Sequence, residues 1–409
     1  MRVLYFHQHF TTPDGTGGTR SYEFARALVA RGHFVTMVCG KSDRDGLVLA
    51  FDPKRNWFRG TIDGIDVIAL PLAYSNRASL TRRTWLFLKF GLRSTWLALR
   101  EEYDLLFATS TPLTAGIPGI CMKLAGRGKP FVFEVRDLWP ELPRALDMKN
   151  PLLLGGMSVL EWASYRAADA CIGLSPGIVE GIRRRSSVGK KVAMIPNGCD
   201  LDFFRPGRRE ELEVAGVGPR DFVAAFMGAH GTANGLDAVL DAATVLLRRG
   251  RSDIKLLFIG DGREKDRLNK RALEDGLSNC VFLAPIKKRA LAEMTGRVDC
   301  GLMILADIPA FYFGTSPNKF FDYLASGIPI INNYPGWLAE MIREADCGAV
   351  VPPGDPEAFA DALIGLADDR EACRAKGSNA RHLAEIRFRR EVLAHGFVEV
   401  LEETMARVN

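Results

Sequence analysis

Apolar runs rich in β-branched and aromatic residues alternate with amphipathic helical patterns from one end of the chain to the other. The runs include FVTMVCG and PFVFEVRD in the first half, and FVAAFMG, IKLLFIGDG and IPIINN in the second. Short runs between helical segments are typical of parallel strands, because each parallel connection needs a crossover helix. The alternation therefore predicts an α/β protein with doubly wound, Rossmann-like sheets.

The chain is too long for a single core. Its 409 residues exceed the size at which one hydrophobic core stops growing, so two domains are expected. The segment IPNGCDLDFFRPG, residues 195–207, is rich in turn formers and divides the chain near its middle. We predict a first domain over residues 1–198 and a second over 199–387. The helical pattern over 388–409 either completes the second domain or crosses back to the first.

Composition limits the class and location of the protein. Apolar residues make up 47% and charged residues 25%, as in a soluble globular protein. The eight cysteines form no CxxC pair, so neither a zinc site nor a disulfide framework is expected. The start MRVLYFHQHF is unlike a signal peptide, and we find no uninterrupted apolar run of about 18 residues. A cytoplasmic protein is predicted.

Positive charge is concentrated in the first half. Lys and Arg against Asp and Glu give 27 − 18 = +9 over residues 1–200, and 27 − 31 = −4 over residues 201–409. Between Arg77 and Arg100, four cations fall within about 20° of one line on a helical wheel: Arg82, Lys89, Arg93 and Arg100. Trp85 and Trp96 flank that line. The pattern favours a helix that binds an anionic membrane surface, and a buried helix with one wet basic face is the alternative. No nucleic acid is expected as a partner, since no recognition motif accompanies the charge.

A glycine-rich turn follows the first predicted strand. The sequence GTGGTRS places Gly17, Gly18 and Arg20 between that strand and a helix. Backbone N–H groups at such a junction can cradle a phosphate, although a turn of this kind also occurs for steric reasons alone. The spacing matches neither GxGxxG nor the Walker motif.

The segment SPNKFFDYLASGIP predicts an anion site at the start of a helix. Turn formers precede a helix whose first N–H groups are unpaired, and Lys319 adds a full positive charge in its first turn. Asp322 can accept hydrogen bonds from vicinal hydroxyls such as those of a ribose. A diphosphate held by Ser316, Asn318 and Lys319 beside that ribose would describe a nucleotide. A capped surface helix is the alternative.

Two further strand ends carry candidate residues. Ile286 lies in the turn after CVFLAP, on the side where a doubly wound sheet binds its ligand, and backbone groups there can hydrogen-bond a base. The sequence FVFEVRDLWPE places Arg136 and Asp137 at the end of another strand. An acid at this position can accept the proton of an acceptor hydroxyl, and a structural ion pair between the two residues is the alternative.

Taken in order, these motifs resemble the retaining glycosyltransferase family 4, which has the GT-B fold of two Rossmann-like domains. The likeness is carried by GTGGTRS, FEVRDLWPE, IPNGCD, FMGAHGTANGLDAVLDAA, FIGDG, VFLAPI and SPNKFFDYLASGIPII. Within the family the chain is most similar to the bacterial O-antigen and capsule subset that includes N-acetylfucosamine transferases. The resemblance implies a donor site in the second domain, an acceptor site in the first, and a last helix that crosses back to the first domain.

The resemblance also implies roles for individual residues. Gly17 and Gly18 would approach the donor diphosphate. Asp322 stands where the family's second glutamate of the E-x7-E motif holds the ribose, whereas the first glutamate of that motif falls at Gly314. The contact that this glutamate makes to the sugar is therefore missing or supplied by another group.

Two phosphate-binding cations of the family are also replaced. The Arg and Lys of its GRxxxxKG motif fall at Ala229 and Asn234. A departing diphosphate needs positive charge to stabilise it, so we expect another cation in their place. Lys319 is the first candidate, His230 the second and Arg20 the third. A neutral loop histidine bonded to backbone is the alternative for His230.

The sequence thus predicts a retaining glycosyltransferase that moves a sugar from a nucleotide diphosphate sugar, UDP favoured over GDP, to a lipid-linked or other glycan in bacterial surface polysaccharide synthesis. Its place would be the cytoplasmic face of the cell membrane. No cofactor other than the donor and no metal ion are expected. Two alternatives are a GT-B-fold sugar-nucleotide epimerase and a nucleotide-sugar-binding protein with impaired catalysis.

Overall fold

The chain forms two compact units in the computed structural model, which describes residues 1–42, 45–74, 78–145, 147–312 and 314–408. The first unit comprises Met1–Pro196, Gly314–Ser316 and Glu391–Asn409, and the second comprises Asn197–Phe313 and Pro317–Arg390. The long final helix of the chain therefore belongs to the first unit.

A nine-stranded sheet of order β3-β4-β5-β2-β1-β6-β7-β8-β9 forms the centre of the first unit. Its strands are β1 Arg2–Phe6, β2 Phe34–Gly40, β3 Ala50–Asp52, β4 Trp57–Ile62, β5 Ile65–Leu70, β6 Leu105–Thr109, β7 Phe131–Val135, β8 Ala170–Gly173 and β9 Lys191–Met194. From β5 to β9 all neighbours pair in parallel, as predicted. The edge strands β3 and β4 are antiparallel, which the predicted all-parallel sheet did not include.

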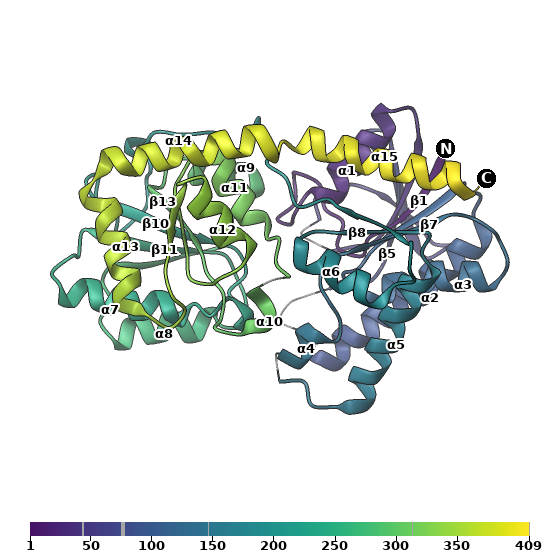
Figure 1. The fold of residues 1–409 in the computed structure, drawn as a ribbon, viewed down its shortest axis with the longest axis horizontal. Coiled ribbons are helices and arrows are strands. Elements are labelled where there is room, and N and C mark those ends of the chain that lie inside the picture. Colours follow the sequence, from purple (N-terminus) through teal and green to yellow (C-terminus); the bar gives the residue numbers. More distant parts are fainter. Residues whose placement is uncertain (43–44, 75–77, 146, 313, 409) are drawn as a thin grey trace. The chain divides into compact units, whose positions relative to one another are not determined.

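Helices cover both faces of this sheet. They are α1 Arg20–Ala30, α2 Leu80–Arg100, α3 Ile117–Leu124, α4 Glu141–Ala145, α5 Pro151–Ala167, α6 Pro176–Arg185 and α15 Arg390–Val408, with a 3₁₀ turn at Leu113–Gly116. Helices α1 and α15 (Figure 1) share one core. In this core the rings of Phe24 and Phe397 stack with their centroids 4.5 Å apart. The opposite core contains side chains of α2, α3, α5 and α6. The alternating side chains of each strand supply both cores.

The second unit contains a six-stranded parallel sheet of order β12-β11-β10-β13-β14-β15. Its strands are β10 Phe222–Met227, β11 Ile254–Ile259, β12 Cys280–Leu283, β13 Cys300–Met303, β14 Ile330–Asn332 and β15 Gly348–Val350. Its helices are α7 Asp237–Arg248, α8 Lys265–Glu274, α9 Lys288–Thr295, α10 Pro309–Tyr312, α11 Asn318–Ser326, α12 Trp337–Glu344, α13 Pro356–Asp368 and α14 Arg370–Arg387, with 3₁₀ turns at Arg209–Glu211 and Thr232–Asn234.

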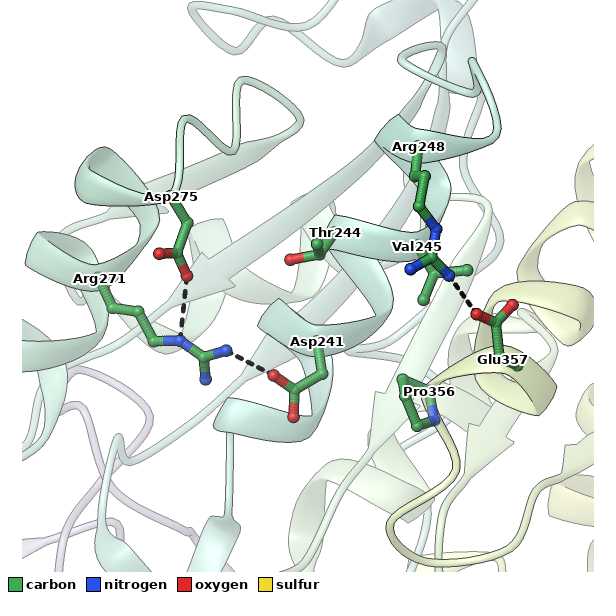
Figure 2. A pocket seen from close by; sticks show the side chains of 8 residues that line it. All are labelled: Asp241, Thr244, Val245, Arg248, Arg271, Asp275, Pro356 and Glu357. Carbon is green, nitrogen blue, oxygen red and sulfur yellow. Dashed lines mark hydrogen bonds and ion pairs between the residues drawn. The ribbon is translucent and has the colours of Figure 1, made fainter.

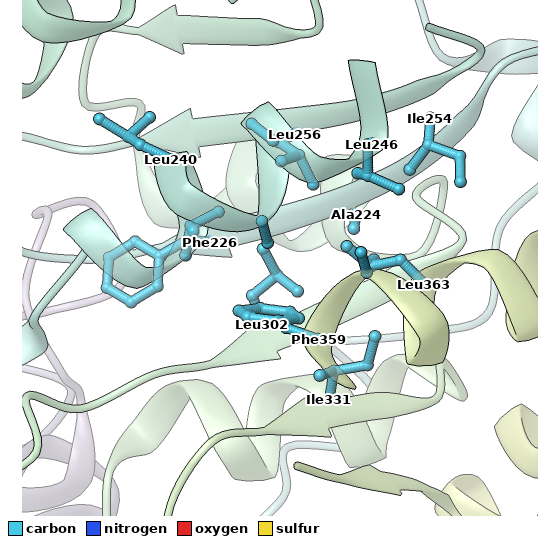
Figure 3. Packing of buried hydrophobic residues seen from close by; sticks show 14 of the residues in the cluster. Ala224, Phe226, Leu240, Leu246, Ile254, Leu256, Leu302, Ile331, Phe359 and Leu363 are labelled. Carbon is cyan, nitrogen blue, oxygen red and sulfur yellow. The ribbon is translucent and has the colours of Figure 1, made fainter. Parts of the chain in front are cut away.

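A dense apolar core fixes the strand ends of the second unit. Phe226 of β10 packs in this core with side chains of α7 and α13, among them Leu240, Leu246, Phe359 and Leu363 (Figure 3). Burial of each large apolar side chain contributes about 1.5–3 kcal/mol. The core therefore holds the carboxyl end of β10, and the loop that follows it, in one place.

Candidate functional site

Lys319 lies in the first turn of α11. Pro317 precedes the helix with φ −76° and ψ 137°, and no side chain caps the first N–H groups. The helix ends where Gly327 adopts a left-handed conformation at φ 66°. The lysine thus stands at the positive end of a short helix dipole.

Three residues from β10 and the loop after it lie around the Lys319 ammonium. Its Nζ is 3.6 Å from the centre of the Phe226 ring and 3.4 Å from Oδ1 of Asn234. A Cβ on Gly228, whose φ is +150°, would lie 3.2 Å from Lys319 Cε, so glycine leaves room for the lysine. Within the described ranges the structure records no carboxylate at ion-pair distance from this ammonium. Its charge is therefore available to a ligand.

Burial governs the protonation of Lys319. Loss of water around the ammonium lowers its pKa to about 7, so about half of the molecules carry this charge at neutral pH. An anion beside Nζ would favour the charged form and raise the pKa again. The lysine can thus gain charge as a diphosphate binds.

Asn234 stands where the resemblance places a phosphate-binding lysine. Its Nδ2 donates to the carbonyl of Ala229 at 2.7 Å, which leaves Oδ1 to accept from Lys319. The ammonium of Lys319 therefore lies next to the position from which the family's lysine is missing.

The imidazole of His230, the second candidate cation of the sequence analysis, is neutral in the unliganded protein. Burial and two nearby lysines lower its pKa to about 4, so its imidazole is neutral at pH 7. Neither ring nitrogen has a hydrogen-bond partner in the described structure, and the ring lies among three aromatic side chains: Phe226, Phe258 and Phe282. The backbone of His230 bonds to the loop after β11, donating to Asp261 O at 3.0 Å. This neutral state agrees with the alternative of a loop histidine, and the role of His230 toward a bound diphosphate stays a prediction.

Asp322 lies on the same helix in different surroundings. Burial raises the pKa of its carboxyl, and the charges that act on it are Lys288, Arg390 and Asp200 rather than Lys319. Its Oδ1 is buried without a hydrogen-bond donor among the described residues. An acceptor in this state costs about 1–3 kcal/mol, so Asp322 has unused capacity for a hydroxyl. The two residues therefore do not form the single cluster that their spacing suggested.

Three other predicted donor-site residues lie in loops or at a helix start. Ile286 is half-buried between β12 and α9, Asn318 is the first residue of α11, and Ser316 precedes it by two positions. Gly314, at the position of the family's first glutamate, is also half-buried. Their roles remain proposals.

The side chain of Arg20 is buried and paired inside the first unit. Its guanidinium pairs with Glu134 at 2.8 Å, with both side chains at most 1% exposed. The same group donates to the carbonyls of Ile195 and Pro196. Burial by itself would raise the pKa of Glu134, but Arg20 and Arg136 lower it, so the carboxylate is ionised. The prediction of Arg20 as a diphosphate ligand does not fit this arrangement, because its donors are already used.

The glycine turn before α1 is tightly packed. A Cβ on Gly17 would lie 2.4 Å from Cγ2 of Thr11, and the backbone N–H of Thr12 donates to Asp45 O at 3.1 Å. Gly18 is half-buried beside it. A side chain at position 17 would require the Thr11 side chain to move, and the role of this turn toward a phosphate stays a prediction.

Arg136 and Asp137 follow β7, as the sequence suggested. The backbone N–H of Arg136 donates to Ser110 Oγ at 3.0 Å, and its Nη1 lies 3.5 Å from Nε2 of His7. Burial raises the pKa of Asp137, and Arg136 partly offsets this shift. Arg136 thus contacts a histidine that the sequence analysis had not selected. A polar residue directly after a parallel strand was the signal that could have found it.

A shallow pocket elsewhere on the second unit is lined by α7, α8 and α13 (Figure 2). Arg271 pairs there with Asp241 and Asp275, and Arg248 pairs with Glu357. These charges satisfy one another, and the pocket contains none of the predicted site residues. We do not regard it as the functional site.

A DxD spacing, Asp200–Leu201–Asp202, lies within the turn-rich segment 195–207. Asp200 accepts from the backbone N–H of Phe203 at 3.1 Å, and Asp202 pairs with Arg205 at 3.3 Å. Both carboxylates thus have local partners within the turn.

Two family models match the chain in succession. The Glycosyl transferase 4-like domain matches residues 15–198, and Glycosyl transferases group 1 matches residues 207–383. Together the two models span most of the chain, and with the two Rossmann-like units they place it in the glycosyltransferase family with the GT-B fold.

Two relatives show how similar the sequence is to glycosyltransferases of known name. A D-inositol 3-phosphate glycosyltransferase of Nocardia farcinica is 30% identical over 201 residues, which is 46% of this chain and 43% of that protein. The lipopolysaccharide core biosynthesis glycosyltransferase LpsE of Rhizobium meliloti is 25% identical over 68% of this chain and 77% of that protein. The chain thus matches less than half the length of the first relative.

Solved structures share the fold over nearly the whole chain. Sucrose-phosphate synthase from Thermosynechococcus elongatus gives a TM-score of 0.78 at 20% identity, covering 99% of each chain. Anabaena Alr3699/HepE in complex with UDP-glucose gives a TM-score of 0.72 at 16% identity, covering 98% of this chain and 100% of that chain. The likeness establishes the GT-B architecture.

Proposed function

We propose that this chain is a retaining glycosyltransferase that transfers a sugar from a UDP-sugar to a lipid-linked glycan acceptor in bacterial surface polysaccharide synthesis. Lys319 carries the proposal, because it is a half-buried cation with no carboxylate partner in the described structure, at the start of a helix beside the β10 loop. Complexes of the structural relative HepE with UDP and UDP-glucose support a uridine nucleotide. The named role of LpsE supports a polysaccharide pathway.

Lys319 would act on the leaving group. As the bond between the anomeric carbon and the diphosphate oxygen breaks, negative charge develops on that oxygen, and the ammonium stabilises it. In the retaining route the acceptor oxygen bonds to the anomeric carbon from the same face, and its proton passes to the departing diphosphate. Asp322 would bind the ribose hydroxyls through its unpaired Oδ1. This chemistry requires no metal ion.

Donor specificity and reaction type can be tested together. We expect UDP-sugars to raise the melting temperature of the protein more than GDP- or dTDP-sugars in a thermal-shift panel. Incubation with the preferred donor and an acceptor should then give a product whose anomeric configuration, read by ¹H NMR, equals that of the donor. An inverted anomer would contradict retention. With donor alone, slow release of UDP is expected, and formation of an epimeric sugar nucleotide would instead identify an epimerase.

Helix α2 supports a membrane surface as the site of action. Five of its large apolar side chains are exposed by 40–64% along one side of the helix: Trp85, Leu88, Leu92, Trp96 and Leu99. Arg82 and Lys89 are exposed on the same helix, whereas Arg93 donates to the carbonyls of Arg55 and Asn56. Arg77, at the start of the predicted segment, lies outside the described residues. No described helix is both long and apolar enough to cross a bilayer. Cations near an anionic bilayer contribute about 1 kcal/mol each, and exposed tryptophans add apolar anchoring.

Sedimentation with vesicles tests this part of the proposal. Wild-type protein should pellet with phosphatidylglycerol vesicles, and the double substitution Trp85→Ser with Trp96→Ser should abolish that binding. Phe34→Ser is the matched control, because Phe34 is a 74% exposed aromatic residue at the start of β2. Equal pelleting of all three proteins would reject a membrane role for α2.

A further inference from the structure

A cluster of polar side chains lies at the carboxyl ends of the strands in the first unit. His7 directly follows β1, His9 lies two residues further on, and Arg136 directly follows β7. Tyr74 follows β5, and Arg83 lies in the first turn of α2. We call these five residues the strand-end cluster. The carboxyl edge of a doubly wound sheet is where such folds bind ligands, so the location is suited to a substrate.

His7 presents a hydrogen-bond donor that no protein group uses. The side chain is 3% exposed, and its Nε2 faces Nη1 of Arg136 at 3.5 Å. A guanidinium can only donate, so Nε2 must be the acceptor and the ring proton must be on Nδ1. Burial and Arg136 hold the pKa of His7 well below its usual value, which agrees with this neutral tautomer. Nδ1 has no partner in the described structure, so its N–H is an unused buried donor.

Both arginines of the cluster interact electrostatically with His9. Burial, Arg136 and Arg83 lower its pKa to about 4, so two guanidinium groups act on one neutral ring. The ring packs edge-on against Tyr74 at 4.6 Å, and the guanidinium of Arg83 lies over the same tyrosine at 5.6 Å. Nε of Arg83 is buried and has no partner among the described residues. The aromatic packing therefore holds the second cation close to His9.

The unused groups of the cluster are donors, and its charge is positive. Buried donors without partners cost about 1–3 kcal/mol each, so a protein retains them where a ligand uses them. Asp137 is the acid that faces Arg136, and burial raises its pKa. Glu134, which is paired with Arg20, also interacts electrostatically with Arg136. The three arginines Arg20, Arg83 and Arg136 still outnumber the two carboxyl groups of Glu134 and Asp137. A ligand group rich in acceptors and carrying negative charge is complementary to this arrangement.

We propose that the strand-end cluster binds an anionic oxygen group, phosphoryl or carboxylate, on the acceptor substrate. The inference rests on the proposed glycosyl transfer, because it assigns this cluster of the first unit to the acceptor. Arg136 and Arg83 supply the charge, and the Nδ1–H of His7 supplies a neutral donor. The cluster would select acceptors that carry an acidic sugar or a phosphate ester over neutral ones.

Binding to UDP-saturated protein tests this inference, since UDP occupies the donor site of the second unit. Inorganic phosphate and D-glucuronate are added in separate titrations. Binding is monitored through the imidazole resonances of His7 and His9 in ¹H–¹⁵N spectra. We expect at least one probe to shift these resonances, and the stronger probe to distinguish phosphoryl from carboxylate. Arg136→Gln and Arg83→Gln should each raise the Kd of that probe at least tenfold and leave the UDP affinity unchanged.

Arg183→Gln is the control, because it removes the same charge from an exposed position on α6. It should not change the Kd of either probe. If neither probe shifts His7 or His9 in protein that still binds UDP, the acceptor inference fails and the proposed donor chemistry stands. If the wild-type protein does not bind UDP, the proposed function itself fails. Equal losses in all three variants would mean general charge attraction rather than a site.

Discussion

Replacement of Lys319 by methionine should remove catalysis and stabilise the protein at the same time. Methionine keeps an unbranched apolar side chain, one heavy atom shorter than that of lysine, and lacks its charge. Loss of one preorganised donor to a developing oxyanion lowers kcat by about 10²–10³, or roughly 2.7–4 kcal/mol. We expect a decrease of this size in UDP release with donor and acceptor present, because Lys319 is the cation that contacts Asn234.

The stability effect follows from the lowered pKa. In the unfolded chain Lys319 has a pKa near 10.5, and in the folded protein its pKa is about 7. Protonation of Lys319 is therefore less favourable in the folded state than in the unfolded chain. The free energy of unfolding rises with pH between about 7 and 10.5, because the unfolded chain binds more protons there. Below pH 7 the penalty is fully present. Because the ammonium is partly exposed and keeps some hydration, we expect Lys319→Met to stabilise the unliganded protein by only about 1–3 kcal/mol at pH 6.

Two measurements and one control test this reasoning. Thermal melts at pH 6 and pH 10 should show a gain for Lys319→Met that is larger at pH 6. For the wild type, kcat/KM should decline as pH rises through about 7, since the free enzyme loses the charge there. Lys270→Met removes one positive charge from exposed α8 and should change neither quantity. Activity within threefold of wild type, or a lower melting temperature at pH 6, would refute the assignment.

Three further predictions concern the packing that supports the sites. Gly260→Ala should lower the melting temperature by several degrees, because the new Cβ would lie 1.9 Å from Gly228 O and the φ of Gly260 is +148°. An unchanged melting curve by circular dichroism would contradict the close approach of the two loops. Glu134→Gln should lower the free energy of unfolding in urea by about 3–5 kcal/mol, because it leaves the buried charge of Arg20 unpaired. The difference from the wild type should shrink as pH falls through the lowered pKa of Glu134. Equal stabilities at pH 7 would argue against the pair. Phe397→Ala should cost about 3–5 kcal/mol by opening a cavity against Phe24, and a loss below 1 kcal/mol would show that α15 contributes little to the first core.

The central strands of both sheets followed from the sequence because their signal is local. A run such as FVTMVCG becomes β2, and IKLLFI becomes β11, since fully buried parallel strands are apolar on both faces. The antiparallel strands β3 and β4 were missed because WFRGTI mixes polar and apolar residues. The turn Asp63–Gly64, with φ of 48° and 81°, was the available signal, since an Asp-Gly pair between two strands favours a tight hairpin.

The candidate site was only partly predictable. Lys319 was found because a cation in the first turn of a helix is visible in the sequence, and the polar residue at 234 was recognised as a departure from the family. Its contact with Lys319 at 3.4 Å was not foreseen, because it joins a helix start to a loop far earlier in the chain. The sequence analysis did not select His7 and His9, although the position of His7 directly after β1 was an available signal; their proximity to Arg136 and Arg83 depends on contacts between distant parts of the chain.

The sequence by itself determined the alternation of strands and helices, the order of the motifs and the presence of a lysine where two family cations are missing. Only the tertiary structure decided which of the candidate cations carry usable charge. The guanidinium of Arg20 is paired with Glu134, and the imidazole of His230 is neutral among aromatic rings. Burial lowers the pKa of Lys319 to about 7. Charge state depends on how much water the surrounding chain excludes, and that exclusion is produced by residues distant in sequence that fold into contact.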